Sequence, residues 1–318
     1  MVGMEYSTFT ANDGTTLAFQ SSLPLTSSLS PANDTIIILL HGFSGSSSYF
    51  TRNFPALSQK SWVLAPDMRG HGRSGHSKGG YHVARLASDL RDFLLHVQSL
   101  TSGKQYKITA IGQSIGAAIL WTYVELFGDN DFTSLIFVDQ APLQDRDLRF
   151  GWDETKAHRG CYDEKSLLAA QEAWTERPEE TYIGLVDECL GYRYRPSPED
   201  KERTPEERKQ DEEYFTSISR VCDGKWLARL LADHTRYDHR EACELITKPT
   251  LVLAGRRSGC FSLEGMGEIV QRVKNGKGLN MHVETKAQMT VFESGHWLFW
   301  EEPERFNQEV LGWVDRWA

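Results

Sequence analysis

The segment of residues 107–118 constrains the fold more than any other stretch of the chain. It reads Lys-Ile-Thr-Ala-Ile-Gly-Gln-Ser-Ile-Gly-Ala-Ala, so a short apolar run leads into Gly-x-Ser-x-Gly and an Ala-rich run follows. The first part is typical of a buried strand and the last part of a helix. The turn between them is too tight for side chains at Gly112 and Gly116, and it exposes the hydroxyl of Ser114 at the helix N-terminus.

A serine hydroxyl is a weak nucleophile by itself, so a serine displayed in this way needs partners elsewhere in the chain. It needs a base that takes its proton, an acid that orients the base, and N–H groups that bind an oxyanion. In open α/β sheets, ligands bind beyond the carboxyl ends of the strands. The partners of Ser114 are therefore expected directly after strands.

Strands and helices alternate on both sides of Ser114. Two short runs at 6–10 and 15–20 flank Asn-Asp-Gly and predict a hairpin. Apolar runs that predict buried strands of a parallel sheet are residues 35–40, 62–66, 135–139, 250–254 and part of 281–292. Helices are predicted at 83–100, 263–274 and 303–317. This order predicts an α/β fold with a doubly wound, mostly parallel sheet.

The alternation stops between residues 144 and 244. This segment is polar and acidic, is rich in Trp and Tyr, and contains no convincing parallel strand. We predict a core domain of residues 1–143 and 245–318, with 144–244 as a helical cap over the C-terminal edge of the sheet. Within the cap, residues 196–210 carry three prolines and many charges, so an exposed connection is expected there.

The composition is that of an ordinary globular protein. The hydrophobic fraction is 40%, and the net charge of −9 argues against a nucleic-acid or anionic-membrane partner. No apolar run approaches the roughly 20 residues needed to span a bilayer, and residues 1–6 lack the features of a signal peptide. The five cysteines are scattered and include no Cys-x-x-Cys. We therefore expect reduced thiols in a cytoplasmic protein, without a disulfide framework or a zinc site.

His296 is the candidate base. It follows directly after the predicted last strand, and a late histidine suits the chain order serine, acid, histidine. His41 and His71 also lie near strand ends, but in loops that we interpret as structural. In the second of these loops, Asp67 is expected to bind nearby backbone amides and Arg69.

The acid that orients this histidine is missing from its commonest position. After the strand at 250–254 the chain reads Gly-Arg-Arg-Ser-Gly-Cys, and Ser258 cannot compensate an imidazolium charge. The next carboxylate at a strand end is Asp139, which can reach the same histidine from the neighbouring strand. Glu264 and Asp238 are the alternatives.

The oxyanion requires two backbone N–H groups aimed at one point. Ile115 supplies one at the N-terminus of a helix, where the helix dipole assists. Phe43, in the loop after the strand at 35–40, is the preferred second donor. Gly42, Gln113 and Trp297 are candidates for contacting the substrate.

Taken together, these motifs resemble the α/β-hydrolase superfamily. The motifs are residues 41–43, 67–74, 112–116 and 295–296, and the resemblance covers about 1–143 and 245–318. It implies eight mostly parallel strands, with Ser114 as nucleophile and His296 as base. The usual acid position is Ser258 here, whereas some members place the acid one strand earlier, as Asp139 would be. Residues 138–142 also look like a branch of cofactor-free haloperoxidases and esterases.

We therefore expect a serine hydrolase of the esterase or lactonase type that acts on a small, apolar or aromatic molecule and requires no metal or cofactor. It would act as a monomer or a homodimer. A carbon–carbon bond hydrolase or an acyltransferase would use the same residues. Epoxide hydrolases and haloalkane dehalogenases need a carboxylate where Ser114 stands. The alternative from another class is a non-catalytic receptor for a small molecule, which the missing acid after 250–254 favours.

Overall fold

The computed structural model describes residues 5–25, 34–101, 104–198, 200, 203–276 and 286–317. Its centre is one sheet of eight strands in the order β1-β2-β4-β3-β5-β6-β7-β8. The strands are β1 (Glu5–Thr10), β2 (Thr16–Ser21), β3 (Thr35–Leu40), β4 (Trp62–Pro66), β5 (Lys107–Gln113), β6 (Ser134–Val138), β7 (Thr250–Gly255) and β8 (Ala287–Phe292). Only the pairs β1–β2 and β2–β4 are antiparallel. The predicted mostly parallel α/β sheet is confirmed.

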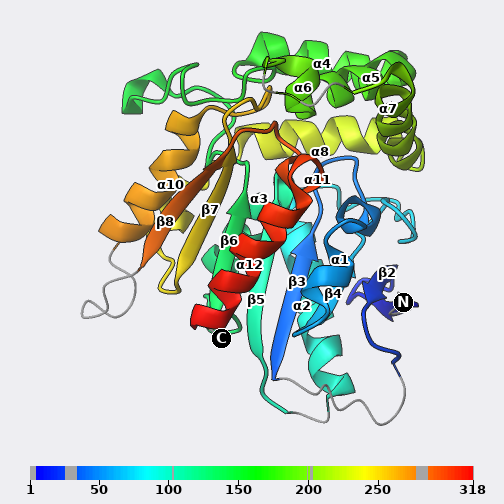
Figure 1. Ribbon diagram of the computed structural model, residues 1–318, viewed down its shortest axis with the longest axis vertical. Coiled ribbons are helices and arrows are strands. Elements are labelled where there is room, and N and C mark those ends of the chain that lie inside the picture. The colour runs from blue at the N-terminus through cyan, green and yellow to red at the C-terminus, as the bar shows by residue number, and fades with distance from the viewer. Residues whose placement is uncertain are drawn as a thin grey trace.

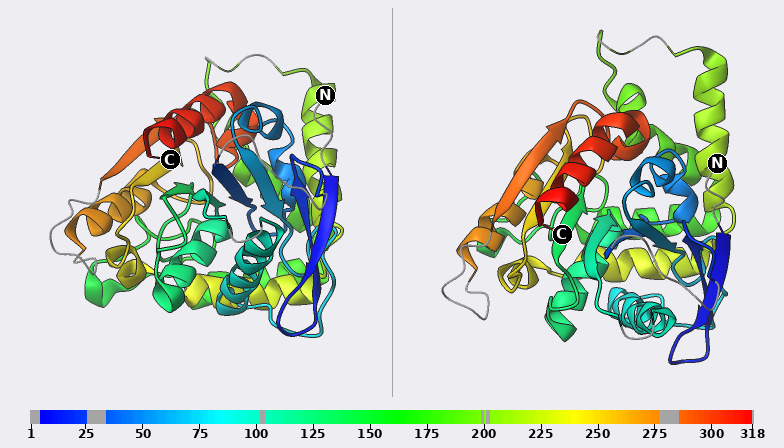
Figure 2. Two further views of the ribbon diagram at one scale, coloured as in Figure 1. Left: turned by 90° about the horizontal axis from the view of Figure 1, so that it is seen from below. Right: turned by 60° about the horizontal axis from the view of Figure 1, so that its bottom comes forward.

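Helices cover both faces of this sheet, which explains why its central strands are buried and mostly apolar. In β3, every residue from Ile36 to Leu40 is buried, and all of β6 and β7 is buried. Helices α1 (Phe54–Leu57) and α12 (Pro303–Trp317) lie on one face (Figures 1 and 2). The other face carries α2 (Val83–Leu100), α3 (Ile115–Phe127) and α10 (Leu263–Asn275).

The chain between β6 and β7 forms helices, as the loss of strand patterning predicts. Helices α4 to α8 gather above the sheet in Figure 1. The segment contains α4 (Glu164–Glu176), α5 (Pro178–Cys189), α6 (Gly191–Tyr194), α7 (Pro205–Ser219), α8 (Gly224–Arg236) and α9 (Arg240–Glu244). Several of these helices share a small apolar cluster that includes Leu167, Trp174 and Leu227. This segment therefore has packing of its own in addition to its contacts with the sheet.

The expected connection at 196–210 is shorter than predicted, because α7 begins at Pro205. Thr204 is the N-cap: its hydroxyl accepts from the Glu207 amide, and the Glu207 carboxylate accepts from the Thr204 amide. Such a capping box, with proline at the first helical position, starts a helix even in a highly charged stretch. Charge and proline content therefore predicted a connection that extends too far, to residue 210.

The loop after β4 also differs in one contact from its prediction. Asp67 binds backbone amides, as expected, by accepting from Ser47 and Arg73. The buried guanidinium of Arg69 pairs instead with Asp89 at 2.7 Å and Asp13 at 2.9 Å. Because these two ion pairs tie the loop to α2 and to the β1–β2 hairpin, Arg69 supports the fold. Among the described residues, Arg69 forms no hydrogen bond or ion pair with Asp67.

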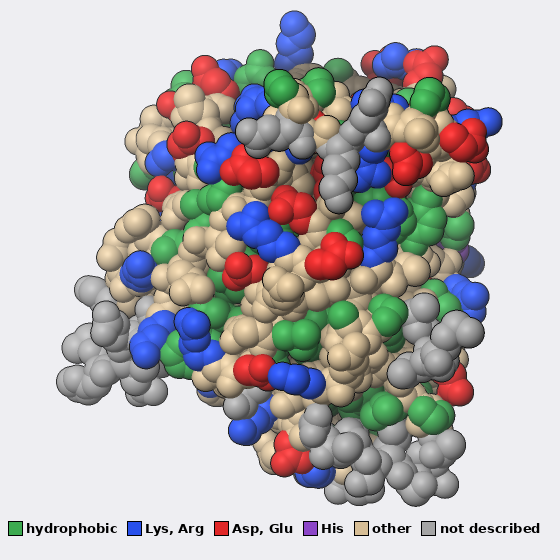
Figure 3. Space-filling model, viewed as in Figure 1, with side chains coloured by type: hydrophobic (Ala, Val, Ile, Leu, Met, Phe, Trp, Pro, Cys, Tyr) green, Lys and Arg blue, Asp and Glu red, His purple; other side chains and the backbone are tan. Residues whose placement is uncertain are grey.

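On the face seen in Figure 3, acidic and basic side chains lie interspersed. Within the described residues, no helix has both the length and the apolar character to cross a membrane. The five cysteines are buried free thiols.

Candidate active site

Ser114 lies in a strained turn between β5 and α3. Its backbone has φ 54° and ψ −125°, a region that residues with a side chain seldom occupy. A Cβ at Gly112 would lie 2.4 Å from the carbonyl oxygen of Gly116, and a Cβ at Gly116 would lie 2.6 Å from that of Leu40. Both glycines are therefore required for the close approach of strand and helix, as the sequence predicts.

His296 lies in the loop between β8 and α11 (Leu298–Glu301) and contacts Asp139. The distance between His296 Nδ1 and Asp139 Oδ1 is 2.7 Å, and both side chains are buried. Asp139 follows β6 directly, two strands away from β8 in the sheet. The expected contact between these two residues is thus present. Neither of the two alternative acids forms a hydrogen bond or ion pair with His296 in the described part of the chain. Asp238 pairs with Arg240, and Glu264 lies in the first turn of α10.

The carboxylate of Asp139 is held by two further donors from the end of β7. The hydroxyl of Ser258 donates to Oδ1 at 2.7 Å, and the amide of Gly255 donates to Oδ2 at 2.6 Å. Asp139 itself has a positive φ of 46°. These hydrogen bonds hold the carboxylate in place against the imidazole of His296.

The second nitrogen of His296 faces the serine turn. Nδ1–H donates to Asp139, so in the neutral ring the lone pair lies on Nε2, where it can accept from the side-chain amide of Gln113, 3.0 Å away. Among the described residues, none shares a hydrogen bond with the hydroxyl of Ser114. Contacts between nucleophile and base often tighten only when substrate binds. The arrangement leaves Nε2 as the atom that can accept a proton.

The surroundings of His296 favour its protonated form. Burial alone lowers its pKa, but the nearby Cys260 and Asp139 act in the opposite direction, and together they raise the pKa to about 10. Negative charge close to an imidazole stabilises the imidazolium. Such a site stabilises the protonated histidine that forms when a serine loses its proton.

Two backbone amides near the turn are candidates for binding an oxyanion. Ile115 is the first residue of α3, and the first N–H groups of a helix have no acceptor within the helix. Phe43 follows β3, and its amide donates no hydrogen bond to another described residue. Gly42, beside it, leaves room for Gln113, whose Oε1 would lie 2.2 Å from a Cβ at that position.

A cavity of about 430 Å³ opens above Ser114. Its apolar lining includes Phe43, Trp174, Leu185, Phe261 and Trp297. Its polar lining includes Gln140, Gln144, His158 and His234. His158 is partly exposed, and the other three are buried. The predicted contact residues Gly42, Gln113 and Trp297 line the cavity as well. Helices α4 and α5 form part of its wall, so the segment between β6 and β7 helps to enclose a bound molecule.

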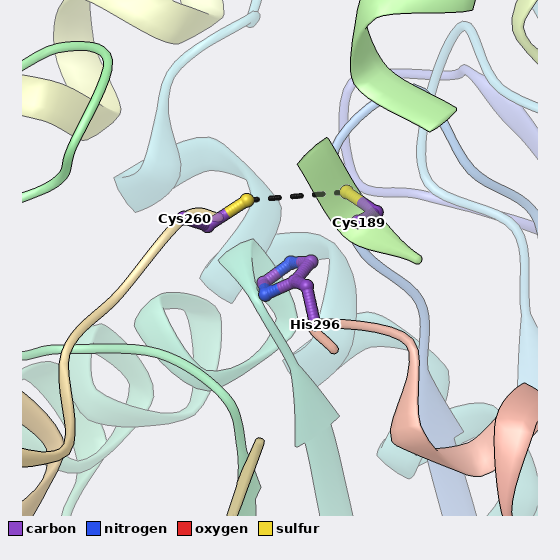
Figure 4. Close-up of side chains that lie close together, drawn as sticks. All are labelled: Cys189, Cys260 and His296. Atoms are coloured by element: carbon purple, nitrogen blue, oxygen red, sulfur yellow. Dashed lines mark hydrogen bonds between the residues drawn. The ribbon is translucent and has the colours of Figure 1, made fainter. Parts of the chain in front are cut away.

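Sequence reasoning missed two residues beside His296. Cys260 lies five residues beyond the end of β7, and Cys189 is the last residue of α5. Their sulfur atoms are 3.9 Å apart, and Figure 4 shows both thiols above the imidazole of His296. The rule that site residues follow strands could have indicated Cys260. Cys189 had no comparable signal, because its position depends on how α5 packs on the sheet.

A family model described as alpha/beta hydrolase fold matches residues 35–303 of the chain. The chain belongs to this family. An esterase from Exiguobacterium antarcticum has a TM-score of 0.78 at 18% identity, over 97% of this chain and 99% of the esterase. A bromoperoxidase from Bacillus anthracis has a TM-score of 0.78 at 16% identity, over 98% and 100% of the two chains. At such identities, the likeness demonstrates a shared fold.

Curated relatives match over a shorter part of the chain. An uncharacterized protein of Mycobacterium tuberculosis is 32% identical over 91 residues, which is 29% of this chain and 25% of that protein. The chain thus matches about a quarter of the length of this relative.

Proposed function

We propose that the protein is a serine hydrolase that cleaves an ester or a lactone of a small molecule through an acyl-enzyme intermediate. The observation that carries the proposal is the 2.7 Å contact between Asp139 and His296 beside the strained turn of Ser114. A nucleophile, a base and an orienting acid in this order are the parts that acyl transfer requires.

In the proposed reaction, the hydroxyl of Ser114 attacks the substrate carbonyl and transfers its proton to Nε2 of His296. The amides of Phe43 and Ile115 stabilise the oxyanion that forms. His296 then protonates the departing alcohol, which leaves an acyl group on Ser114. Water, deprotonated by His296, attacks this acyl group and releases the acid. Throughout, the anionic Asp139 stabilises the imidazolium.

Before attack, the amide of Gln113 has to release Nε2, because the serine proton needs the same lone pair. The Gln113 Oε1 atom is buried and has no hydrogen-bond partner among the described residues. A substrate that approaches the turn can accept from the freed amide N–H. Displacement of Gln113 therefore accompanies substrate binding in this proposal.

The cavity supports a small substrate with both an apolar and a polar part. Its volume of about 430 Å³ is that of a typical small-molecule site. Phe43 and Trp174 pack edge to face at 5.0 Å and provide an aromatic surface near the proposed oxyanion site. On the polar side, Gln140 is 1% exposed and its Oε1 has no partner among the described residues, so it is available to a donor on the substrate.

The alternative functions differ in whether they catalyse a reaction and in which reaction that is. A carbon–carbon bond hydrolase or an acyltransferase would use Ser114, His296 and Asp139 in the same way. A receptor would bind a small molecule in the same cavity without catalysing a reaction. The hydrogen bonds to Asp139 favour catalysis over the receptor, because they hold a charged acid on the base although the commonest acid position is Ser258.

The test is labelling with a fluorophosphonate probe, followed by hydrolysis assays with short aryl esters and lactones. The wild type should be labelled and should hydrolyse some of them, and Ser114→Ala should do neither. Ser294→Ala is a matched control: it replaces another buried serine near His296 whose hydroxyl has no hydrogen-bond partner among the described residues, and it should keep both properties. An unlabelled, inactive wild type would support the receptor.

A further inference from the structure

Three soft or borderline metal ligands converge beside the proposed base. The thiols of Cys189 and Cys260 and one nitrogen of His296 all lie within 4.8 Å of one another. All three residues are buried and line the cavity above Ser114. They come from three separate elements, namely the end of α5 and the loops after β7 and β8. Figure 4 shows their side chains pointing toward a common centre.

The spacing of the two sulfur atoms is that of two ligands around one cation. They are 3.9 Å apart, whereas a disulfide bond would bring them to about 2.0 Å. Two thiolates at about 2.3 Å from a tetrahedral zinc ion are about 3.8 Å apart. A Zn²⁺ ion between Cys189 and Cys260 therefore requires almost no movement of their sulfur atoms.

His296 is already oriented as a metal ligand. Its Nδ1–H donates to Asp139 at 2.7 Å, and a histidine that binds zinc commonly donates its other ring N–H to a carboxylate in this way. The nitrogen left for the cation is Nε2, which the side-chain amide of Gln113, 3.0 Å away, has to release first. Two thiolates and a neutral imidazole compensate the charge of Zn²⁺, so the occupied site suits a buried location. Because all three residues line the cavity, a fourth and exchangeable ligand can come from it, as in zinc sites with two cysteines and one histidine.

We propose that Cys189, Cys260 and His296 form a binding site for a thiophilic divalent cation such as Zn²⁺, and that the bound cation inhibits hydrolysis. Inhibition follows because the cation and the proton of Ser114 compete for the same lone pair on Nε2. The cation also joins α5 to the loops after β7 and β8. Inhibition rests on the proposed hydrolase function, whereas cation binding does not.

Binding is measured without reference to catalysis on Ser114→Ala, in a buffer with a phosphine reductant that keeps the thiols reduced. Titration with Cd²⁺ should produce thiolate-to-metal charge-transfer absorption that saturates at one cation per chain. Adding Cys189→Ala or Cys260→Ala to this variant should weaken binding by at least about tenfold. Adding Cys243→Ala should leave binding unchanged, because Cys243 is buried in α9 outside the cavity. Serine replacements serve where an alanine variant does not fold.

Inhibition is measured by titrating Zn²⁺ into the protein with its natural serine, while an aryl ester is hydrolysed in the same reductant. Zn²⁺ should abolish hydrolysis, and a chelator should restore it. The inhibitory concentration should rise at least about tenfold in Cys260→Ala, judged against that variant's own rate without zinc. Cys243→Ala should match the wild type.

The outcomes separate the two proposals. Charge-transfer absorption at one equivalent, together with a wild type that stays inactive after treatment with a chelator, supports the cation site and refutes the hydrolase. An active enzyme that shows no such absorption, or one whose inhibition by Zn²⁺ is equal in Cys189→Ala, Cys260→Ala and the wild type, overturns the cation site. Loss of activity only in the absence of reductant also overturns it, because that result indicates oxidation of the thiols.

Discussion

Ser258 donates a hydrogen bond of 2.7 Å to Asp139, the acid that contacts His296. Ser258 stands at the strand end that is the commonest position for such an acid. The acid comes instead from the neighbouring strand β6, and the serine binds it. The hydroxyl of Ser258 also accepts from the amides of Cys260 and Phe261, so it links the acid to the loop that carries Cys260.

Replacing Ser258 with alanine should weaken both the fold and the site. A hydrogen bond to a charged group contributes about 1.5–3 kcal/mol, so the free energy of unfolding should fall by about that amount. The loss of a donor also leaves Asp139 less firmly oriented, which should lower kcat. Denaturant unfolding and ester hydrolysis measure the two effects, with Ser294→Ala as control. Unchanged stability and kcat would show that the serine has no supporting role.

Asp139→Asn should reduce kcat by about 10⁴-fold, the loss that follows when an amide replaces the acid of a serine triad. The asparagine keeps the shape of the side chain but no longer holds the imidazole with Nδ1 protonated. Steady-state kinetics on the most active ester measure the change. Full activity in Asp139→Asn would require another acid for His296.

The acid can be moved to the commoner strand. In the double variant Asp139→Ser with Ser258→Asp, the carboxylate and the hydroxyl exchange places across their 2.7 Å contact. We expect hydrolysis to recover in part relative to Asp139→Ser alone. Equal rates for the single and the double variant would mean that a carboxylate at position 258 does not reach His296.

The pH dependence of kcat/KM should report the raised pKa of His296. Only the neutral imidazole can accept a proton, and its pKa is raised to about 10, so the rate should increase with pH through the alkaline range. Cys260→Ala removes one cause of this increase in pKa, so the rising limb should move to lower pH. Cys243→Ala should leave it in place. A limb at the same pH in Cys260→Ala would exclude an electrostatic contribution from the thiol.

Gly116→Ala should destabilise the protein, while Gly267→Ala should not. A Cβ at Gly116 would lie 2.6 Å from the backbone oxygen of Leu40, which has no freedom to move aside. Overpacking of this kind costs about 1–3 kcal/mol. Gly267 lies within α10 with nothing inside 4 Å of an added Cβ, so alanine there should stabilise the helix by about 1 kcal/mol. Thermal unfolding of the two variants provides a matched comparison.

Many strands and helices of the core could be predicted from the sequence, because the patterns that indicate them are local. The strand at 35–40 and the helices at 83–100 and 303–317 have the predicted bounds, since each depends on side-chain periodicity within the segment itself. The helical segment between β6 and β7 could be recognised only by its lack of strands. Helix α7 begins at the capping box of Thr204, although the composition of this segment predicted an exposed connection. Part of the segment expected to contain the last strand, residues 281–285, lies outside the described residues.

The sequence by itself determined the tight turn at Ser114, the two glycines that permit it, and the positions of Asp139 and His296 directly after strands of a parallel sheet. These features follow from steric limits and from the rule that parallel strands end on the same side. Only the tertiary structure decided that Ser258 binds Asp139 and that Cys189 meets Cys260 above His296. Those contacts join residues far apart in the chain, and side-chain packing across separate elements sets them.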